Sequence, residues 1–426
     1  MESDYSDVIV CGSGPAGLAA ADAAAETGAS VKVLEKQDRI GGKLPYSGNG
    51  KCNFSNVLDD VPFMNAFGRA GRFMTDALRC GGRDWFCEHL RKHNVEVEAV
   101  DGFHYFPKSG DAMDIMNSFY QAKVVYEKRR VVTSVCLDEN GAVCGVRVRY
   151  PSQVDEIFYP AKAVILACGG TAMSALGGTA AGLRIAEQLG HKIVQPLPAM
   201  APLYLQEDWL KELSGVSLKH VQLQYSSGRN HGKTTGEMLF THDGVSGPAA
   251  LNLSNDAYRV WQDGDARAKF ELKLNFDTTV DWRSSIDMFR KQESNKFLRS
   301  SLSTFLPKSL AFAICKHLGW EERKNQTLKD VERDQLVSLL TSCPLTIARL
   351  CPMERAMAMS GGVSWREIKP QTMESRLVPG LYFAGEMIDL TGPCGGYNIQ
   401  FAVASGRLAG LSARNSWKND EKSGNF

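Results

Sequence analysis

Residues 7–17 read DVIVCGSGPAG, and this stretch decides how the N-terminal part of the chain folds. Its apolar start suits a buried parallel strand. Gly12, Gly14 and Gly17 then fit the spacing G-x-G-x-x-G, and a helix is expected over residues 17–27. In this motif the first glycine makes a tight turn, the second admits a pyrophosphate and the third lets the helix pack on the strand. We therefore expect a dinucleotide phosphate at the positive end of this helix.

The residues after the motif favour FAD over NAD. A second strand over residues 30–35 ends in Glu35, where an acid accepts hydrogen bonds from an adenosine ribose and disfavours a 2′-phosphate. Residues 41–56 (GGKLPYSGNGKCNFSN) then form a polar loop that contains Lys43 and Lys51. Its N–H groups and lysines suit the remainder of a long dinucleotide. A solvated acid and a flexible surface loop are the plainer alternatives.

Composition describes an ordinary globular protein in a reducing compartment. The 426 residues are 43% hydrophobic and 23% charged, which predicts two or three domains. The net charge of +1 gives no reason to expect a polyanionic partner, although it is compatible with a local basic patch. The eleven cysteines form no C-x-x-C pair, so we expect reduced thiols and no metal site. With no signal peptide and no apolar run of membrane-spanning length, a cytoplasmic protein without membrane contact is expected.

Changes in pattern divide the chain into four segments. The predicted domains are the N-terminal part of the FAD-binding domain (1–195), a β-rich substrate-side domain (196–280), a small helical domain (281–350) and the C-terminal part of the FAD-binding domain (351–426). The first boundary rests on a cluster of prolines, and the last on a return of glycine-rich sequence. Near the end, GLYFA at 380–384 predicts a strand, followed by a loop and a helix from about Tyr397.

Four blocks together resemble one family, the bacterial BaiN-like flavoproteins, also described as aminoacetone-oxidase-type FAD-binding enzymes. Residues 12–56 resemble its N-terminus, and residues 236–248 (GEMLFTHDGVSGP) resemble its middle-domain signature. Residues 355–374 and 380–406 resemble its return to the FAD domain and its closing block. The chain departs from the family pattern at Lys51, at Cys168 and over residues 171–179. The last departure leaves the substrate open.

The resemblance implies an α/β fold: a two-part Rossmann-like FAD-binding domain of the glutathione-reductase and fumarate-reductase type, with an inserted β-rich domain and a small helical domain. By similarity, the backbone of Val132 lies near the adenine, Ala167 to Gly169 pass the pyrophosphate, Glu386 contacts the ribityl chain and Asp389 stands close by. Motifs and resemblance together predict these cofactor-binding residues: Gly12, Gly14, Pro15, Ala16, Gly17, Glu35, Lys36, Gly42, Lys43, Ser47, Gly48, Gly50, Lys51, Cys52, Asn53, Val132, Ala167, Cys168, Gly169, Gly385, Glu386, Asp389, Gly395, Gly396, Tyr397, Asn398 and Ile399.

The closing block is expected to face the flavin ring. Its glycines would let the backbone pass flat against the ring. The N–H groups at the start of the following helix would stabilise negative charge on the reduced ring by about 0.3–1 kcal/mol. In the middle domain, His242 is the candidate catalytic residue, as a proton donor or a carbonyl ligand. A structural histidine at a domain junction is the alternative.

The expected activity is a two-electron FAD-dependent oxidation–reduction, preferably reduction of an activated C=C bond in a small or medium organic substrate. No second dinucleotide motif occurs between residues 150 and 350, so NADH or NADPH would bind transiently as the electron donor. The alternatives are amine oxidation with O₂, reduction of uracil in RNA to dihydrouridine, and a non-catalytic flavin carrier. The charge balance counts against RNA. The oligomeric state is left open.

Overall fold

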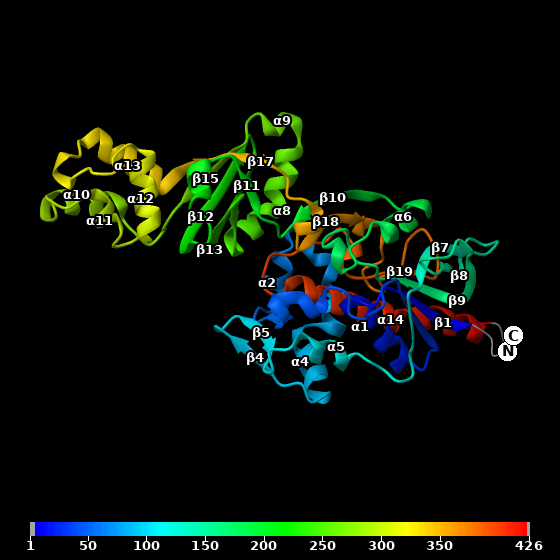
Figure 1. The fold of residues 1–426 in the computed structure, drawn as a ribbon. Coiled ribbons are helices and arrows are strands. Elements are labelled where there is room, and N and C mark those ends of the chain that lie inside the picture. The colour runs from blue at the N-terminus through cyan, green and yellow to red at the C-terminus, as the bar shows by residue number, and fades with distance from the viewer. Residues whose placement is uncertain (1–4, 424–426) are drawn as a thin grey trace. The chain divides into compact units, whose positions relative to one another are not determined.

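The computed structural model describes residues 5–423, which form two compact units. Unit 1 contains the residues up to Pro196 and those from Ala358 onward, and unit 2 contains Leu197–Met357. Both ends of the chain therefore contribute to unit 1, as the neighbouring blue and red segments of Figure 1 show.

Unit 1 is built around a parallel sheet. β1 (Ser6–Cys11) is entirely apolar over Val8–Cys11 and lies between β2 (Val31–Glu35) and β9 (Ile157–Leu166). β6 (Val125–Lys128) extends the sheet beyond β2, and β19 (Leu381–Phe383) pairs with the last residues of β9. All these pairs are parallel, and buried strands of this kind require helices on both faces. The predicted Rossmann-like α/β architecture is confirmed.

Smaller sheets complete unit 1. β7 (Val131–Leu137) and β8 (Val143–Arg149) form an antiparallel hairpin that continues onto the first half of β9. β3 (Ser55–Asn56), β5 (His104–Pro107) and β4 (Val97–Val100) form a three-stranded sheet, and β10 (Ile193–Ala199) pairs with β18 (Ala358–Val363). The helices of this unit are α1 (Pro15–Glu26), α2 (Asp60–Asn65), α3 (Thr75–Gly81), α4 (Arg83–Lys92), α5 (Ala112–Ser118), α6 (Ala181–Gln188) and α14 (Tyr397–Ser423).

The first and last helices of unit 1 pack against each other at backbone distance. A Cβ added to Gly406 would lie 2.1 Å from the carbonyl oxygen of Ala16, and one added to Gly410 would lie 2.2 Å from that of Ala20. Because both contacts advance in the same direction, the two helices are parallel. The start of α14 then extends beyond the start of α1 by about eight residues, or about 12 Å. Their N-termini thus point in the same direction and lie at different positions along the packed pair.

Unit 2 contains an antiparallel sheet and a group of helices. The sheet has the order β16–β15–β12–β13–β14–β11–β17. Its strands are β11 (Leu203–Leu205), β12 (Ser217–Ser227), β13 (Asn230–Thr241), β14 (Gly244–Ser246), β15 (Glu271–Asn275), β16 (Cys343–Leu345) and β17 (Ile347–Arg349). Its helices are α7 (Asp208–Lys211), α8 (Pro248–Gln262), α9 (Gly264–Arg267), α10 (Trp282–Gln292), α11 (Leu298–Leu302), α12 (Lys308–His317) and α13 (Asp330–Ser342).

Along the chain, helices α10 to α13 come between β15 and β16, and these two strands pair with each other. Leu272 of β15 is opposite Leu345 of β16, so the chain returns to the same sheet after the helical segment. The predicted β-rich and helical segments are thus parts of one compact unit. Within residues 5–423, no helix combines the length and the apolar character that a bilayer crossing requires.

Candidate functional site

The three glycines of the N-terminal motif have different neighbours. Gly12 has φ +101°, and a Cβ there would lie 2.6 Å from the carbonyl oxygen of Ala167. A Cβ on Gly17 would lie 1.9 Å from the carbonyl oxygen of Gly12. At both positions the backbone of the protein itself therefore leaves no room for a side chain. A Cβ on Gly14, in contrast, would meet no atom within 4 Å. The free space at Gly14 is where the motif places a pyrophosphate.

The beginning of α1 has the chemistry that this pyrophosphate needs. Gly14 is the N-cap residue, no side chain caps the helix, and the first turn contains no acidic residue. Pro15 occupies the first position, so the N–H groups of Ala16 and Gly17 are the donors that lack an intrahelical acceptor. The site therefore fits a dinucleotide phosphate through backbone donors and the helix dipole.

Glu35 lies at the end of β2, next to the glycine loop, and is 7% exposed. One carboxylate oxygen accepts hydrogen bonds from the N–H of Ser13 at 2.9 Å and from its hydroxyl at 2.6 Å, and the other accepts from the N–H of Gln37. A carboxylate has about four acceptor positions, so one remains for a ribose hydroxyl. Burial lowers the pKa of neighbouring Lys36, although Glu35 acts in the opposite direction. Arg130, two residues before Val132, donates its N–H to the carbonyl oxygen of Glu35.

The polar loop that follows β2 folds back onto the glycine motif. The N–H of Gly41 donates to the carbonyl oxygen of Ser13 at 3.0 Å, and a Cβ on Gly42 would lie 3.7 Å from the Cα of Gly14. The loop residues Gly42, Gly48, Gly50 and Cys52 all have positive φ, as a tight coil requires. Ser47 is partly exposed and Lys51 is exposed, so their side chains are accessible. The structure thus places the start of this loop, at Gly41 and Gly42, beside the glycine motif.

Glu386 connects three segments of unit 1. One of its carboxylate oxygens accepts from the ammonium group of Lys43 at 2.5 Å and from the N–H of Gly170 at 3.1 Å. The other accepts from the N–H of Met359 at 2.9 Å. Gly169 lies beside the same carboxylate. The predicted residues Lys43, Gly169 and Glu386 are therefore neighbours, and Glu386 fixes the loop around them.

The closing block packs on the loop from the N-terminus. Gly396 has φ +81°, and a Cβ there would lie 2.5 Å from the backbone of Ser55. The side-chain amide of Asn56 donates to the carbonyl oxygen of Gly395 at 2.8 Å. With its amide oriented to satisfy its neighbours, Asn53 also accepts from the N–H of Gly396 at 3.3 Å. The requirement for glycine at position 396 thus comes from a protein backbone.

Side chains at the start of α14 also hold this loop. Asn398 accepts from the N–H of Gly392 at 2.8 Å and donates to its carbonyl oxygen at 2.9 Å. Tyr397 packs against Phe63 with the two rings tilted and their centroids 4.9 Å apart. Ile399 is partly buried, Asp389 donates its N–H to Val363, and Gly385 donates its N–H to the hydroxyl of Ser405. The start of α14 is thus rigidly placed.

The cysteines of the candidate site have surroundings that favour the neutral thiol. Burial raises the pKa of Cys168 to about 12, with a smaller contribution from Glu35. Burial also raises the pKa of Cys52 to about 12 and that of Cys394 to about 11. All three therefore favour the protonated thiol near neutral pH, which is the less reactive form.

His242 lies in unit 2, in the turn between β13 and β14, and its side chain is exposed. Within residues 5–423, no hydrogen bond is found for its ring. Its neighbour Asp243 forms an ion pair with Arg355 at 3.6 Å, and Arg355 donates to the hydroxyl of Tyr204 at 3.4 Å. Sequence reasoning missed this group of three side chains. No local sequence signal marks this group, and the φ of +150° at Gly244 that accompanies the close strand contact is visible only in the structure.

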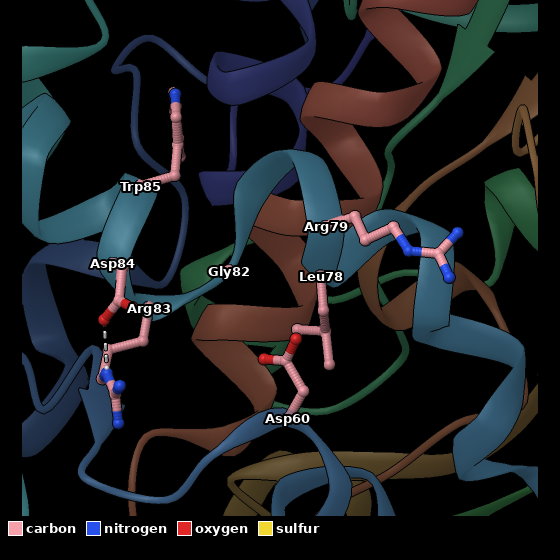
Figure 2. Close-up of a pocket in the computed structure, with 7 residues that line it drawn as sticks. All are labelled: Asp60, Leu78, Arg79, Gly82, Arg83, Asp84 and Trp85. Carbon is pink, nitrogen blue, oxygen red and sulfur yellow. Dashed lines mark hydrogen bonds and ion pairs between the residues drawn. The ribbon is translucent and has the colours of Figure 1, made fainter.

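A surface pocket of unit 1 lies apart from the predicted residues. Figure 2 shows it at the junction of α3 and α4, with Arg83 paired to Asp84. Arg83 also donates to the carbonyl oxygens of Val57 and Leu58, so its guanidinium group is engaged in contacts within the protein. The pocket is lined by Asp60, Leu78, Arg79, Gly82, Arg83, Asp84 and Trp85. None of these was predicted to bind the cofactor.

Comparisons with known proteins agree with this geometry. The family model described as "HI0933-like protein Rossmann domain" matches residues 6–412. A "Ribosomal RNA dihydrouridine synthase" of Haemophilus influenzae is 30% identical, covering 96% of this chain and 99% of the relative. A "3-dehydro-bile acid delta(4,6)-reductase" of Clostridium scindens is 28% identical, covering 95% and 98%. The resemblance to the BaiN-like flavoproteins is confirmed.

A solved structure supports the fold alone. The 3-ketosteroid delta1-dehydrogenase of Sterolibacterium denitrificans superposes with a TM-score of 0.52 at 14% identity, covering 97% of this chain and 100% of that one. This is the two-part FAD-binding fold that the resemblance implied.

Proposed function

Because the chain belongs to the HI0933-like family of FAD-binding flavoprotein oxidoreductases, we propose that it reduces a C=C bond conjugated to a carbonyl group, with NADH or NADPH as electron donor. Two relatives of different substrate class have names that share this chemistry. A Δ4 bond in a 3-dehydro steroid is conjugated to the ketone, and dihydrouridine is uridine with its ring C=C bond saturated. For this chain we favour a small or medium organic substrate.

The observation that carries the flavoprotein assignment is the pair of parallel helix N-termini. The α1 terminus offers the N–H groups of Ala16 and Gly17 to the pyrophosphate, beside the free space at Gly14. The α14 terminus lies about 12 Å further along the same direction. That offset suits an extended dinucleotide, with its phosphates at one terminus and its ring at the other. Bound FAD supplies the two-electron hydride chemistry.

The protein residues position this cofactor and supply protons. Glu35 would hold the ribose, and the Lys43–Glu386 pair would fix the loop that closes over the phosphates. The first N–H groups of α14 would stabilise the charge of the reduced ring. His242 is the candidate proton donor, since its ring is exposed and an imidazole side chain can serve as a general acid. These roles are proposals that the following experiments test.

The decisive experiment separates the two half-reactions. The purified protein is loaded with FAD, reduced anaerobically with NADH or NADPH, and followed at about 450 nm, the usual absorption band of oxidised flavin. Addition of 2-cyclohexenone or a 3-keto-Δ4-steroid should restore the band, with formation of the saturated ketone. Bleaching by an amine in the absence of nicotinamide would instead indicate amine oxidation. A protein that binds no FAD would contradict the assignment altogether.

Reduction of uracil in ribosomal RNA is the second candidate, favoured by the name of the Haemophilus influenzae relative. The net charge of +1 offers little general attraction for RNA, so any such binding would need a local surface. Incubation of the reduced protein with unmodified ribosomal RNA, followed by mass spectrometry of nucleosides, tests it. A gain of two mass units in uridine identifies dihydrouridine, and its absence together with enone turnover favours the small substrate.

A further inference from the structure

A histidine and a carboxylate are paired at the β4–β5 hairpin of unit 1. Its turn contains Asp101 and Gly102, with φ +54° and +71°, and the N–H of Phe103 donates to the carbonyl oxygen of Val100 at 3.1 Å. An Asp-Gly pair with positive φ at both residues is a favoured turn between antiparallel strands. The turn therefore holds Asp101 three residues before His104, the first residue of β5.

The carboxylate of Asp101 fixes the imidazole of His104. Its Oδ1 accepts from the N–H groups of Phe103 and His104, both at 3.2 Å. Nδ1 of His104 lies 3.1 Å from Oδ1 and 2.9 Å from Oδ2. Hydrogen bonding from His104 lowers the pKa of Asp101, so this group is a carboxylate near neutral pH. A carboxylate can only accept, so Nδ1 carries the hydrogen, and Nε2 is the nitrogen that can gain or lose a proton.

Nε2 of His104 lies beside the closing block. A Cβ on Gly395, which has φ +117°, would lie 3.5 Å from this nitrogen. Asn56 of β3 is opposite His104, and its side-chain amide donates to the carbonyl oxygen of Gly395 at 2.8 Å. The paired strands β3 and β5 therefore hold the imidazole against the loop that leads into α14. This loop is the part of unit 1 that is expected to face the flavin ring.

The imidazole is accessible, and its titratable neighbours are few. The side chain of His104 is 33% exposed, and within residues 5–423 no hydrogen bond occupies Nε2. Burial raises the pKa of Tyr397 in α14, and it raises that of Cys394 in the closing block to about 11, so both are neutral near neutral pH. Tyr105, the next residue of β5, is on the opposite face of the strand. The carboxylate of Asp101 is thus the charged group that the imidazole meets.

From this arrangement we infer that His104 takes up a proton at Nε2 when the bound flavin is reduced and releases it when the flavin is reoxidised, with Asp101 as its positioning residue. The inference rests on the flavin assignment within the proposed function and is independent of the substrate. A hydride brings two electrons and adds one negative charge to the ring, and the proton on Nε2 balances that charge. When the hydride leaves, the same proton is released. Reduction of a C=C bond by NADPH consumes one proton overall, which the protein would hold between the two half-reactions.

The start of α14 favours this coupling. A helix N-terminus disfavours a cation nearby and favours an anion. Tyr397 begins α14 two residues after Gly395, so a proton on His104 would meet the positive end of the helix. Negative charge on the ring would offset this repulsion, and the imidazolium and the helix would then stabilise the same charge. Proton uptake and reduction are therefore expected to occur together.

The test counts the protons bound on reduction and needs no substrate. FAD-loaded full-length protein is reduced electrochemically between about pH 5 and 8, and the midpoint potential of the flavin is recorded at each pH. One extra proton bound with two electrons changes the equilibrium constant a further tenfold per pH unit, which is about 30 mV. The parent protein should show this extra slope over part of the range, and His104→Gln should lose it.

Further variants separate a charge effect from a structural one. Arginine is a cation that keeps its proton, so His104→Arg should lose the extra slope but have a higher potential than His104→Gln at the alkaline end. Asp101→Asn removes the carboxylate but keeps an acceptor for Nδ1, so it should retain only part of the slope. His93→Gln is the control, since His93 is an exposed histidine of unit 1 whose ring is hydrogen-bonded to the carbonyl oxygen of His89. It should match the parent protein.

Nuclear magnetic resonance of the histidine rings gives a second measurement that does not depend on how a variant folds. The ring ¹⁵N signals of His104 are identified by their loss in His104→Arg. At a pH within the range of extra slope, they should show a neutral ring in the oxidised parent protein and an imidazolium in the fully reduced one. An unchanged ring would overturn the inference even if the His104 variants are unstable.

Potential and turnover together separate the two proposals. If FAD binds but the parent protein and His104→Gln have the same slope, the inference about His104 is overturned and the proposed function is unaffected. If His104 gains the proton and no conjugated carbonyl compound is reduced, the inference stands and the proposed function fails. A protein that binds no FAD would contradict both.

Discussion

At the scale of single residues, a substitution at Gly14 should change cofactor binding without changing folding. Gly14→Ala should fold normally, because a Cβ there meets nothing within 4 Å in the protein. The same methyl group would occupy the space assigned to the pyrophosphate, so the FAD dissociation constant should rise at least tenfold. Thermal unfolding of the apoprotein and titration with FAD measure the two effects.

Gly12→Ala serves as the contrasting variant. Its Cβ would lie 2.6 Å from the carbonyl oxygen of Ala167, so the apoprotein itself should be destabilised. If Gly14→Ala binds FAD as tightly as the parent protein, the pyrophosphate does not lie at this glycine.

A second residue-scale feature is the buried pair Asp22 and His89. Asp22 is 1% exposed and accepts from the side-chain amide of Gln121 at 2.6 Å, while within residues 5–423 its other oxygen has no hydrogen-bond partner. That oxygen lies 4.0 Å from Nδ1 of His89. Nε2 of His89 faces the carbonyl oxygen of Ser118 and must donate to it, so in the neutral ring Nδ1 is an acceptor. Two acceptors therefore face each other.

The pair makes stability depend on pH in a defined direction. Burial raises the pKa of Asp22 to about 6 from 3.8, with Gln121 and Arg407 opposing the rise. The folded state therefore binds this proton more tightly than the unfolded state. Stability from this group is complete below about pH 4 and is lost as pH rises through 6, a change of about 3 kcal/mol. Burial lowers the pKa of His89 to about 4, so His89 has the opposite effect at acidic pH.

Asp22→Asn should therefore stabilise the protein above pH 6, by about 3 kcal/mol, because it removes the buried charge. An asparagine can also donate to Nδ1 of His89. The gain should shrink toward pH 4. Thermal unfolding at pH 5, 6 and 8 measures it, with the exposed Asp155→Asn as the control. An equal shift at all three pH values would show that the effect is unrelated to this titration.

At the scale of elements, the packing of α1 on α14 links the two ends of the chain. Gly410→Ala should destabilise unit 1 by about 1–3 kcal/mol, because the new Cβ would lie 2.2 Å from the carbonyl oxygen of Ala20. Displacement of α14 should also weaken FAD binding. Chemical denaturation and FAD titration measure both quantities.

Gly264→Ala in α9 is the matched control, since its Cβ meets nothing within 4 Å. It should leave stability within about 1 kcal/mol of the parent value. Unchanged stability of Gly410→Ala would indicate that the two helices are more loosely packed than this contact implies.

Sequence reasoning predicted the elements around the glycine motif because their signals are local. The β1–loop–α1 unit, the closing strand and the start of the closing helix were found with errors of at most two residues, whereas the end of that helix was placed too early. The α1 helix begins at Pro15 rather than Gly17, since proline is favoured at the first position. The contact between Tyr204 and Arg355 could not be predicted, because it depends on antiparallel pairing across more than a hundred residues.

The sequence alone also could not show which neighbouring group makes a particular glycine necessary. Gly396 was interpreted as a position where the backbone passes against the flavin ring. In the structure its added Cβ atom would lie 2.5 Å from the backbone of Ser55. A glycine indicates a close approach, but the identity of the neighbour depends on the tertiary fold.

At the scale of the whole molecule, unit 2 leaves and rejoins unit 1 at neighbouring strands, β10 and β18. A chain in which residues 197–357 are replaced by a short glycine linker should therefore fold and bind FAD. It should not reduce an enone, because the candidate proton donor His242 lies in unit 2. Absorption spectra and turnover assays measure both, and a colourless product would show that unit 1 depends on unit 2 for its cofactor.

The paired strands at which the chain crosses between its units have an evolutionary consequence. A segment whose two ends emerge side by side can be exchanged or lengthened as a cassette, since its replacement requires no new path through the parent domain. Recognition of a steroid and recognition of a nucleoside can then diverge in the cassette while the parent domain keeps one redox chemistry. Chimaeras joined at Pro196 and Ala358 would transfer selectivity between distant members of the family.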